Sequence, residues 1–453
     1  MSRSIEDVVA RAEADGVRLV RFLYCDPSGV IRGKNVHVKR LAARMREGVG
    51  LTRAQNAVNV LEDLVDVVGM EPVGEVRVVP DPDTYTVLPW VPATAGLLCD
   101  QLDHDFTDWG GCSRSFLKRV IDRAAAAGVV VKASFENEFY LAHEVDGDVR
   151  PWADGPVYSS AGMDRAAGVM ADIVTALEAQ DLEVEQAINE YGPGQQEIAI
   201  RYSDALRAAD NQLKFRDAVR GVAEVGHGLV ASFAPKPFED GVGSGAHIHF
   251  SLWSTDETTN LLHDPDGGPT GLSVLGRQFV AGVLEHLPAL VALTCPSVNS
   301  YDRLRPDAWA GSTVSWGLDN REVAVRVASH FAGREMESTN LELKASDPSC
   351  NPYLALGGLI LAGLDGIERQ LEPPEPAARN PSKLSPAEQT RAGIRPLPAS
   401  LPEALTALER DRVLFEPLGE LLGRCILAVR RAEAAAVESM PPDRRRQPYL
   451  RVF

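Results

Sequence analysis

Two glutamates alternate within a short stretch of the chain. Residues 135–140 read Phe-Glu-Asn-Glu-Phe-Tyr, so Glu136 and Glu138 are two positions apart. The β-branched run at residues 129–131 and the flanking aromatic residues predict a strand. Alternate side chains of a strand share one face, so the two carboxylates repel each other unless a cation lies between them. A solvated edge strand would tolerate the same pair, and the pair alone leaves both interpretations open.

A second pair of acids flanks a predicted turn. Glu190 and Glu197 lie on either side of Gly192-Pro193-Gly194, whose composition predicts a tight reversal between two strands. Their carboxylates can therefore converge. The alternative is a surface hairpin with incidental acids, but both glutamates adjoin apolar strand residues. No helix opens after these glycines, so the segment is not a dinucleotide-binding fingerprint.

Histidines follow a glycine-rich segment further along the chain. Residues 241–245 carry three glycines, which permit close backbone approach to a ligand, and they lead into His247, His249 and Ser251. These three side chains would share one face of a strand. A lone histidine at such a place is more often a satisfied core residue. Two histidines on one face, after glycines, favour a site.

The last group combines a glutamate with cationic side chains. Glu342 and Lys344 are two positions apart, a pattern that an alternating surface strand explains equally well. Arg303, Arg321 and Arg326 lie in polar segments near predicted strands. A guanidinium group suits carboxylate and phosphate oxygens, although each arginine singly is more often a surface ion pair.

Together these groups predict two cation sites and phosphoryl transfer. Hard oxygen ligands favour Mg²⁺ or Mn²⁺, and two such ions beside arginines are the equipment of phosphoryl transfer. No Walker loop and no kinase signature is present, so ATP would need another kind of site. One alternative is a metal-dependent hydrolase, which would leave the arginines unexplained. Another is a structural protein without catalytic activity, which would not need the metal ligands. The candidate ligands are Glu136, Glu138, Glu190, Glu197, Glu342 and His247.

Composition limits the class of protein. The chain has 453 residues, 45% apolar and 24% charged, and a net charge of −18, which disfavours nucleic acid and anionic membranes as partners. Six scattered cysteines without a Cys-x-x-Cys pair suit a reducing compartment. The start of the chain lacks a secretory pattern, and the longest apolar helix candidate, residues 353–364, is shorter than the ~20 residues of a membrane span. We therefore expect a cytoplasmic protein.

Two regions must position these residues. A helix at residues 5–14 and a hairpin of strands at 18–24 and 30–38 predict a small, mostly β region that ends near residue 105. Helices and strands then alternate. Helices are expected at residues 114–127, 164–180, 204–225, 273–286, 353–371 and 420–435, with a proline-rich excursion at 372–402.

The order of these segments resembles the glutamine synthetase family. The matching motifs are Phe135–Phe139, Asn189–Glu197, Gly243–His249, Asn299–Arg303, Asn320-Arg321, Glu342, Asp347-Pro348 and Asn351–Leu354. The resemblance implies an α+β fold with a β-grasp-like domain at residues 1–107. It also implies an ATP-binding catalytic domain at residues 108–453, with an antiparallel half-barrel flanked by helices. Ring-shaped homo-oligomers, usually dodecamers with active sites between subunits, are implied as well.

The resemblance also implies roles for individual residues. Glu138, Glu190 and Glu197 would bind one metal ion, and Glu136, His247 and Glu342 would bind the ion that meets the γ-phosphate. Arg321 would stabilise the transferred phosphoryl group, acting with Glu342 and Arg303 as the catalytic residues. Tyr202, His249, Ser251 and Arg326 would contact ATP, and Gly243, Arg303 and Lys344 would hold glutamate.

Departures from the family pattern bear on the second substrate. Ammonia-using members carry an aspartate in the loop that corresponds to residues 48–55, and this chain has none there. Trp309 stands where their flap carries a glutamate, and an indole offers a surface for an organic amine. Lys344 and Asn340 replace arginines that contact glutamate and phosphate. We therefore expect a glutamate–amine ligase, with a true ammonia-using glutamine synthetase as the alternative.

Overall fold

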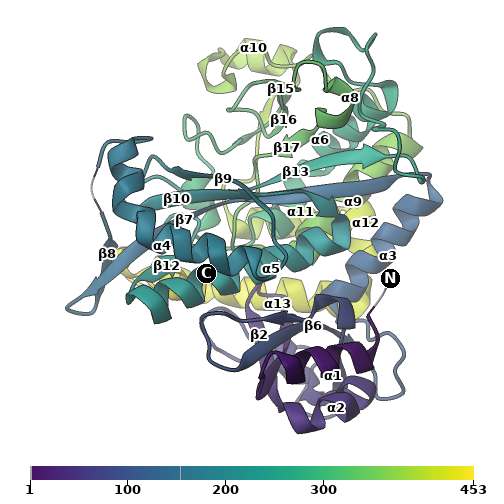
Figure 1. Cartoon of the computed structure of the whole chain (residues 1–453). Coiled ribbons are helices and arrows are strands. Elements are labelled where there is room, and N and C mark those ends of the chain that lie inside the picture. The colour runs from purple at the N-terminus through teal and green to yellow at the C-terminus, as the bar shows by residue number, and fades with distance from the viewer. Residues whose placement is uncertain (1–2, 154) are drawn as a thin grey trace.

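The N-terminal region is a small sheet with helices on one side, at the bottom of Figure 1. The computed structural model describes residues 3–153 and 155–453. The first helix, α1 (Ile5–Ala14), starts at a capping box on Ser4, as its sequence predicts. The sheet order is β2-β1-β6-β4-β3 with β5 beside β6, and β1 and β6 run parallel. The remaining bounds are β1 (Leu19–Cys25), β2 (Ile31–His37), α2 (Leu41–Glu47), β3 (Val49–Thr52), β4 (Glu75–Pro80), β5 (Thr86–Val87) and β6 (Thr94–Leu102).

The second region is organised around a large sheet whose central strands, β7 and β13, cross the middle of Figure 1. Its strand order is β15-β16-β17-β13-β7-β10-β9, and every pair on this path is antiparallel except β15–β16. The predicted α+β class with an antiparallel catalytic sheet is confirmed. The bounds are β7 (Val130–Val145), β8 (Asp148–Pro151), β9 (Val184–Asn189), β10 (Gln195–Ile200), β11 (Ser203–Asp204), β12 (Val230–Ser232), β13 (Ala246–Trp253), β15 (Trp316–Leu318), β16 (Val325–Val327) and β17 (Leu341–Leu343). A separate ribbon pairs β14 (Thr313–Val314) with β18 (Arg395–Pro396).

Helices cover this sheet. In Figure 1, α4 (Ser160–Glu178) and α5 (Ala205–Gly221) lie below it. The core contains α6 (Val274–Thr294) and α9 (Pro352–Glu368), which pack so closely that a side chain at Gly282 would overlap the carbonyl of Ala362. The other helices are α3 (Ser113–Ala126), α7 (Ser300–Arg303), α8 (Glu335–Ser338), α10 (Pro386–Arg391), α11 (Leu401–Arg410), α12 (Arg412–Phe415), α13 (Gly419–Glu438) and α14 (Tyr449–Val452).

The predicted end of α6 at residue 286 is wrong. The helix continues to Thr294 and passes through Pro288. Proline removes one backbone donor and normally bends or ends a helix. Here almost every residue from Phe279 to Thr294 is buried against the core, so tertiary burial outweighs the local signal.

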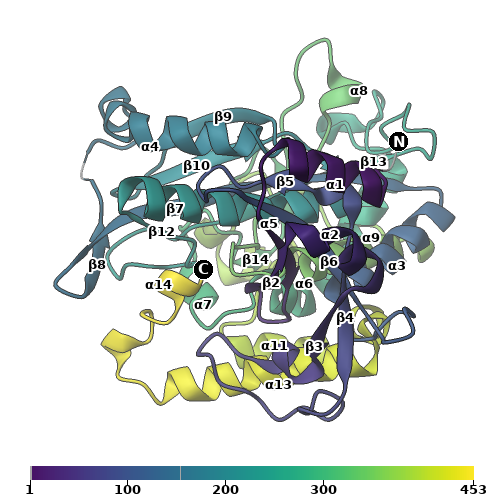
Figure 2. The ribbon, with the colours of Figure 1, turned by 60° about the horizontal axis from the view of Figure 1, so that its bottom comes forward.

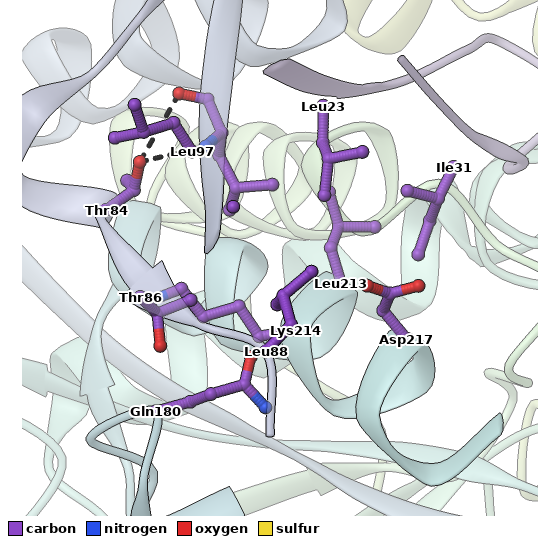
Figure 3. A pocket seen from close by; sticks show the side chains of 12 residues that line it. Leu23, Ile31, Thr84, Thr86, Leu88, Leu97, Gln180, Leu213, Lys214 and Asp217 are labelled. Atoms are coloured by element: carbon purple, nitrogen blue, oxygen red, sulfur yellow. Dashed lines mark hydrogen bonds between the residues drawn. The ribbon is translucent and has the colours of Figure 1, made fainter. Parts of the chain in front are cut away.

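The two regions are packed directly against each other. The long helix α13 lies against strands of the N-terminal region in Figure 2, and the buried Arg430 on it donates to the carbonyl of Ser28 at 2.9 Å. A largely apolar cavity between β1, β6 and α5 holds about 10 Å³, enough for a single water at most (Figure 3). The predicted domain boundary at residues 107 and 108 falls between the end of β6 and the start of α3, and it stays a prediction. Among the residues that the structure describes, no helix is long and apolar enough to cross a membrane.

Candidate active site

Strand register places the predicted acids and histidines on neighbouring strands. His247 on β13 lies opposite Glu136 on β7, and His249 lies opposite Glu342 on β17. On the other side of β7, Glu138 lies opposite Glu197 of β10. Directly opposed residues of antiparallel strands have their Cβ atoms about 5 Å apart, so these side chains can meet. Segments separated by more than 200 residues thus contribute to one site.

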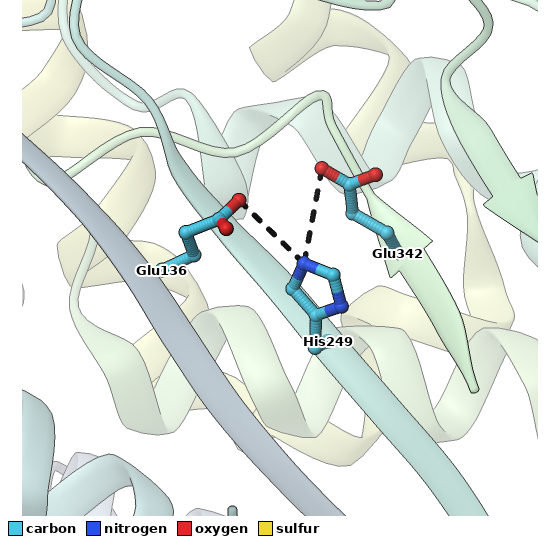
Figure 4. Close-up of side chains that lie close together, drawn as sticks. All are labelled: Glu136, His249 and Glu342. Carbon is cyan, nitrogen blue, oxygen red and sulfur yellow. Dashed lines mark ion pairs between the residues drawn. The ribbon is translucent and has the colours of Figure 1, made fainter. Parts of the chain in front are cut away.

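Glu136, His249 and Glu342 form the first cluster, and Figure 4 shows their side chains converging from three strands. Each offers one ligand atom, and these atoms lie within 4.8 Å of one another. His249 Nε2 is 3.6 Å from Glu136 Oε2 and 3.9 Å from Glu342 Oε1, and this buried nitrogen has no hydrogen-bond partner. A buried nitrogen without a partner, between two carboxylates, fits a divalent cation. The family resemblance implies that His249 contacts the nucleotide, and that assignment stays a prediction.

His247 lies two positions before His249 on β13 and contacts the same two carboxylates. Its Nδ1 lies 3.2 Å from Glu136 Oε2 and 3.2 Å from Glu342 Oε1. Burial, followed by the positive charge of Lys344, lowers the pKa of His247 to about 4. A neutral imidazole is the form that binds a metal. For His249, burial opposes the charge, but Glu136 and Glu342 raise the pKa to about 9, so without a metal ion its imidazolium balances the two carboxylates. His247 is therefore the neutral histidine of this cluster.

Positive charge around Glu342 keeps its carboxylate ionised. Arg326 Nε lies 2.8 Å from Glu342 Oε2, and Lys344 Nζ lies 3.1 Å from Oε1. Burial opposes ionisation, but Lys344, the two histidines and Arg326 lower the pKa of Glu342 to about 2. The Lys344 ammonium is thus engaged by a neighbouring carboxylate.

Glu138, Glu190 and Glu197 form a second cluster with the opposite electrostatic character. Burial is the main cause that raises the pKa of Glu138 to about 7, and Arg303 only partly offsets it. Burial and then the charges of Glu136, Glu138 and Glu190 raise the pKa of Glu197 to about 10. Burial also raises the pKa of Glu190. Clustered acids with raised pKa values lack a compensating cation, so this donor set fits a divalent ion with oxygen ligands.

Arg303 lies beside both clusters. Its Nη2 is 3.2 Å from His247 Nε2 and donates to the carbonyl of Lys344 at 3.2 Å, while Nη1 is buried without a partner. An unpaired guanidinium nitrogen inside a site fits a carboxylate of a small substrate. A side chain at Gly243 would lie 2.6 Å from Arg303 Cγ, so the glycine is needed for close approach to Arg303. The sequence predicted that the glycines of this segment approach a ligand.

A cavity of about 680 Å³ opens next to the first cluster. Tyr202, His249 and Ser251, the predicted nucleotide contacts, all line it, and Arg326 is not among its lining residues. The cavity is large enough for a nucleotide. Sequence reasoning missed Phe331 and Met336, which enter from the segment around α8. The sequence feature that could have indicated them is the presence of two large apolar side chains in a polar loop, and both are exposed in the structure.

Arg321 and Trp309 lie on loops rather than in this cavity. Arg321 is exposed, and its positive charge acts on the carboxylate of Glu190, whose pKa it lowers against the effect of burial. Trp309 lies between α7 and β14 with 53% of its surface exposed and a backbone φ of 52°. A tryptophan in the left-handed region is uncommon, so the surrounding loop must hold it there.

The arrangement can bind two cations, a nucleotide and a small anion side by side. One carboxylate cluster adjoins the cavity, the positive charge of Arg321 acts on Glu190 of the other, and Arg303 acts on both. Cations and arginines at such positions stabilise negative charge on phosphate oxygens.

Models of known families match both regions of the chain. Residues 110–449 match the glutamine synthetase catalytic domain, and residues 4–113 match the glutamine synthetase N-terminal domain.

Individual relatives match over almost the whole chain. The gamma-glutamylpolyamine synthetase GlnA3 of Streptomyces coelicolor is 38% identical over 94% of this chain and 92% of its own. A glutamine synthetase of Methanocaldococcus jannaschii is 34% identical over 96% of this chain and 95% of its own. Among solved structures, a GmaS–ADP complex superposes with a TM-score of 0.85 at 30% identity, covering 97% of this chain and 99% of that one.

Proposed function

Because the chain belongs to the glutamine synthetase family, we propose that it joins the γ-carboxylate of L-glutamate to an organic amine. Membership makes the chain an ATP-dependent carbon–nitrogen ligase, and the choice of amine is the proposal. The observation that carries this choice is the exposed indole of Trp309, which stands where the flap of ammonia-using members carries a glutamate. An indole offers an alkyl chain and its ammonium group a stacking surface.

The first half-reaction is phosphorylation of glutamate. A γ-carboxylate oxygen of glutamate attacks the terminal phosphorus of ATP, and ADP leaves with the electrons of the broken P–O bond. ATP binding in the 680 Å³ cavity is supported by the cavity's size and by the ADP bound to GmaS. Bound Mg²⁺ or Mn²⁺ ions would neutralise phosphate oxygens. Arg303 would orient glutamate through its unpaired Nη1, and Arg321 would stabilise the transferred phosphoryl group.

The second half-reaction forms the amide. The uncharged amine nitrogen attacks the acyl carbon of γ-glutamyl phosphate, the C–O bond to phosphate breaks, and the nitrogen loses a proton. Glutamate and the amine must be held together in one geometry, because orientation supplies much of the rate of such reactions. The name of the Streptomyces coelicolor relative, a gamma-glutamylpolyamine synthetase, supports an organic amine here.

Phosphate release tests the proposal. Purified protein with ATP, Mg²⁺ and glutamate should release phosphate when putrescine, spermidine or ethanolamine is added, and little when ammonia is added. Glu138→Gln should reduce turnover by at least about 100-fold, since it removes a candidate metal ligand. Glu144→Gln is the matched control, because Glu144 lies on the exposed end of the same strand. Equal or faster turnover with ammonia would contradict the proposal.

The second candidate is a true glutamine synthetase that uses ammonia. The archaeal glutamine synthetase, similar over 96% of the chain, favours it. The same amine series decides between the two, because each substrate is added separately to one enzyme preparation.

Assembly and location complete the proposal. A ring of subunits, as a dodecamer with active sites between neighbours, would cover the apolar side chains of Leu64, Val68 and Val73, which are exposed on the N-terminal region. A cytoplasmic location suits the six free, buried cysteines. Mass measurement by light scattering tests the ring.

A further inference from the structure

Three loops meet in a corner on the Arg321 side of the site. The segment 304–311 carries Trp309, the segment 320–324 follows β15, and the segment 377–383 precedes α10. Asn320 Nδ2 donates to the carbonyl of Ala377 at 2.8 Å, and Lys383 Nζ lies 2.8 Å from Asp307. Both ties join the third loop to the other two, so the corner is held in one geometry.

Glu322 occupies this corner without a cationic partner. Its side chain is partly buried, and no lysine, arginine or histidine nitrogen in the described part of the chain lies within 4.0 Å of it. The charges of two lysines act on its pKa, but both lysines form ion pairs with other carboxylates, Lys344 with Glu342 and Lys383 with Asp307. Burial, and then the negative charge of Asp307, raises the pKa of Glu322. A partly desolvated carboxylate without a cationic partner is suited to a cation from outside the chain.

Trp309 lies next to this carboxylate. Its backbone N–H points at the Glu322 side chain. The loop that carries it is seated on the residues after Glu322, because a side chain at Gly311 would lie 2.7 Å from the Cα atom of Ala324. The indole itself is 53% exposed. The backbone of Trp309 thus lies beside the carboxylate, and the same residue carries an exposed indole. A carboxylate and an indole carried by one corner can recognise alkylammonium groups by charge and by cation–π contact.

We infer that Glu322 and Trp309 form a subsite for a positively charged end of the amine substrate, so that diamines and polyamines are preferred to amines with one nitrogen. This inference rests on the proposed function. The attacking nitrogen must lose its charge to react, whereas a second amino group stays protonated near neutral pH. That second ammonium pairs with Glu322. A monoamine, or the hydroxyl end of ethanolamine, leaves the partly buried carboxylate unpaired, which lowers its affinity.

The test compares two amines with the same carbon chain. Putrescine is a four-carbon diamine, and butylamine carries one amino group on the same chain. The wild-type enzyme should show a higher kcat/KM for putrescine. Glu322→Gln should lower kcat/KM for putrescine about tenfold or more, the range expected for a lost hydrogen bond to a charged group, and should leave butylamine within about twofold. Glu375→Gln, an exposed carboxylate in the neighbouring loop, should change neither value.

A second variant protects the test against misfolding. Glu322→Asp keeps the charge on a shorter side chain and should retain part of the preference for putrescine. Melting curves with ATP present should be similar for all four proteins.

The outcomes separate the two proposals. A wild-type preference for putrescine that survives in Glu322→Gln, or an equal loss for both amines, would overturn the subsite and leave the ligase intact. A wild-type enzyme that uses ammonia and neither amine would overturn the proposed function and the subsite with it.

Discussion

Replacing Glu197 with glutamine should stabilise the metal-free protein while weakening its response to Mg²⁺. The Glu197 carboxylate is only 9% exposed and adjoins Glu138 and Glu190, and no hydrogen bond to it contributes to its raised pKa. Glutamine has nearly the same shape and no charge. The substitution therefore removes repulsion without removing a contact within the described part of the chain.

The pKa of Glu197 sets the magnitude. The ordinary carboxyl has a pKa of 4.5, and the folded protein raises it to about 10. At pH 8 the folded state must hold a proton that the unfolded chain has lost, which costs up to about 5 kcal/mol. Because Glu138 and Glu190 share the repulsion and a buried amide has its own desolvation cost, we expect a measured gain of about 1–3 kcal/mol.

The sign of the pH dependence follows from the same values. Above pH 4.5 the folded state binds more protons than the unfolded state, so the free energy of unfolding falls as pH rises towards 10. The gain from Glu197→Gln should be near zero at pH 4.5 and should grow through pH 6, 7 and 8. Chemical denaturation in EDTA at each pH measures it.

Added MgCl₂ completes the assay. It should raise the melting temperature of the wild-type protein at pH 8 by more than that of Glu197→Gln, because the variant keeps the Glu136 cluster but lacks one ligand of the second cluster. The variant should also lose phosphoryl transfer. Glu178→Gln, an exposed glutamate at the end of α4, is the control and should match wild type throughout. The reasoning is refuted if Glu197→Gln is less stable than wild type in EDTA at pH 8, or if its gain does not vary with pH.

Two further predictions concern the helical core. Gly282→Ala should lower the free energy of unfolding by about 3 kcal/mol or more, because its methyl group would overlap α9. Gly168→Ala, in open space on α4, should raise it by about 0.5–1 kcal/mol. Urea denaturation of both variants checks this, and equal effects would contradict it. His286 binds Asp411 at 2.6 Å and Asp365 at 2.9 Å, and although burial opposes its charge, these hydrogen bonds raise its pKa. His286→Gln should therefore destabilise by about 1–3 kcal/mol at pH 6 and by less at pH 9, where wild-type His286 has lost its proton, and a loss that grows with pH would contradict this.

The sequence was informative where local chemistry determines structure. The cap at Ser4 fixed the start of α1, and the turn at Gly192-Pro193-Gly194 brings β9 and β10 into a hairpin. Alternation along β7 placed Glu136 and Glu138 on one face. Such signals act within a few residues, so they are readable without the rest of the fold.

Sequence reasoning failed where contacts between distant segments determine the structure. The continuation of α6 through Pro288 depends on burial against α9, and the apolar residues that enter the nucleotide cavity belong to a loop with no strong local pattern. The fold places His247 and His249 against the same two carboxylates, and the separate roles that the family resemblance implies for them stay predictions.

The sequence by itself determined which groups can bind cations and phosphate, because carboxylates in alternation, histidines after glycines and clustered arginines carry that chemistry in any fold. Only the tertiary structure decided how the charges are shared. Glu342 is surrounded by cations and ionises readily, while Glu197 is buried among acids and resists ionisation. It also placed Glu322 beside the backbone of Trp309 without a cationic partner in the described part of the chain. Desolvation and the distance between charges set these differences, and both arise only when the strands and loops are packed together.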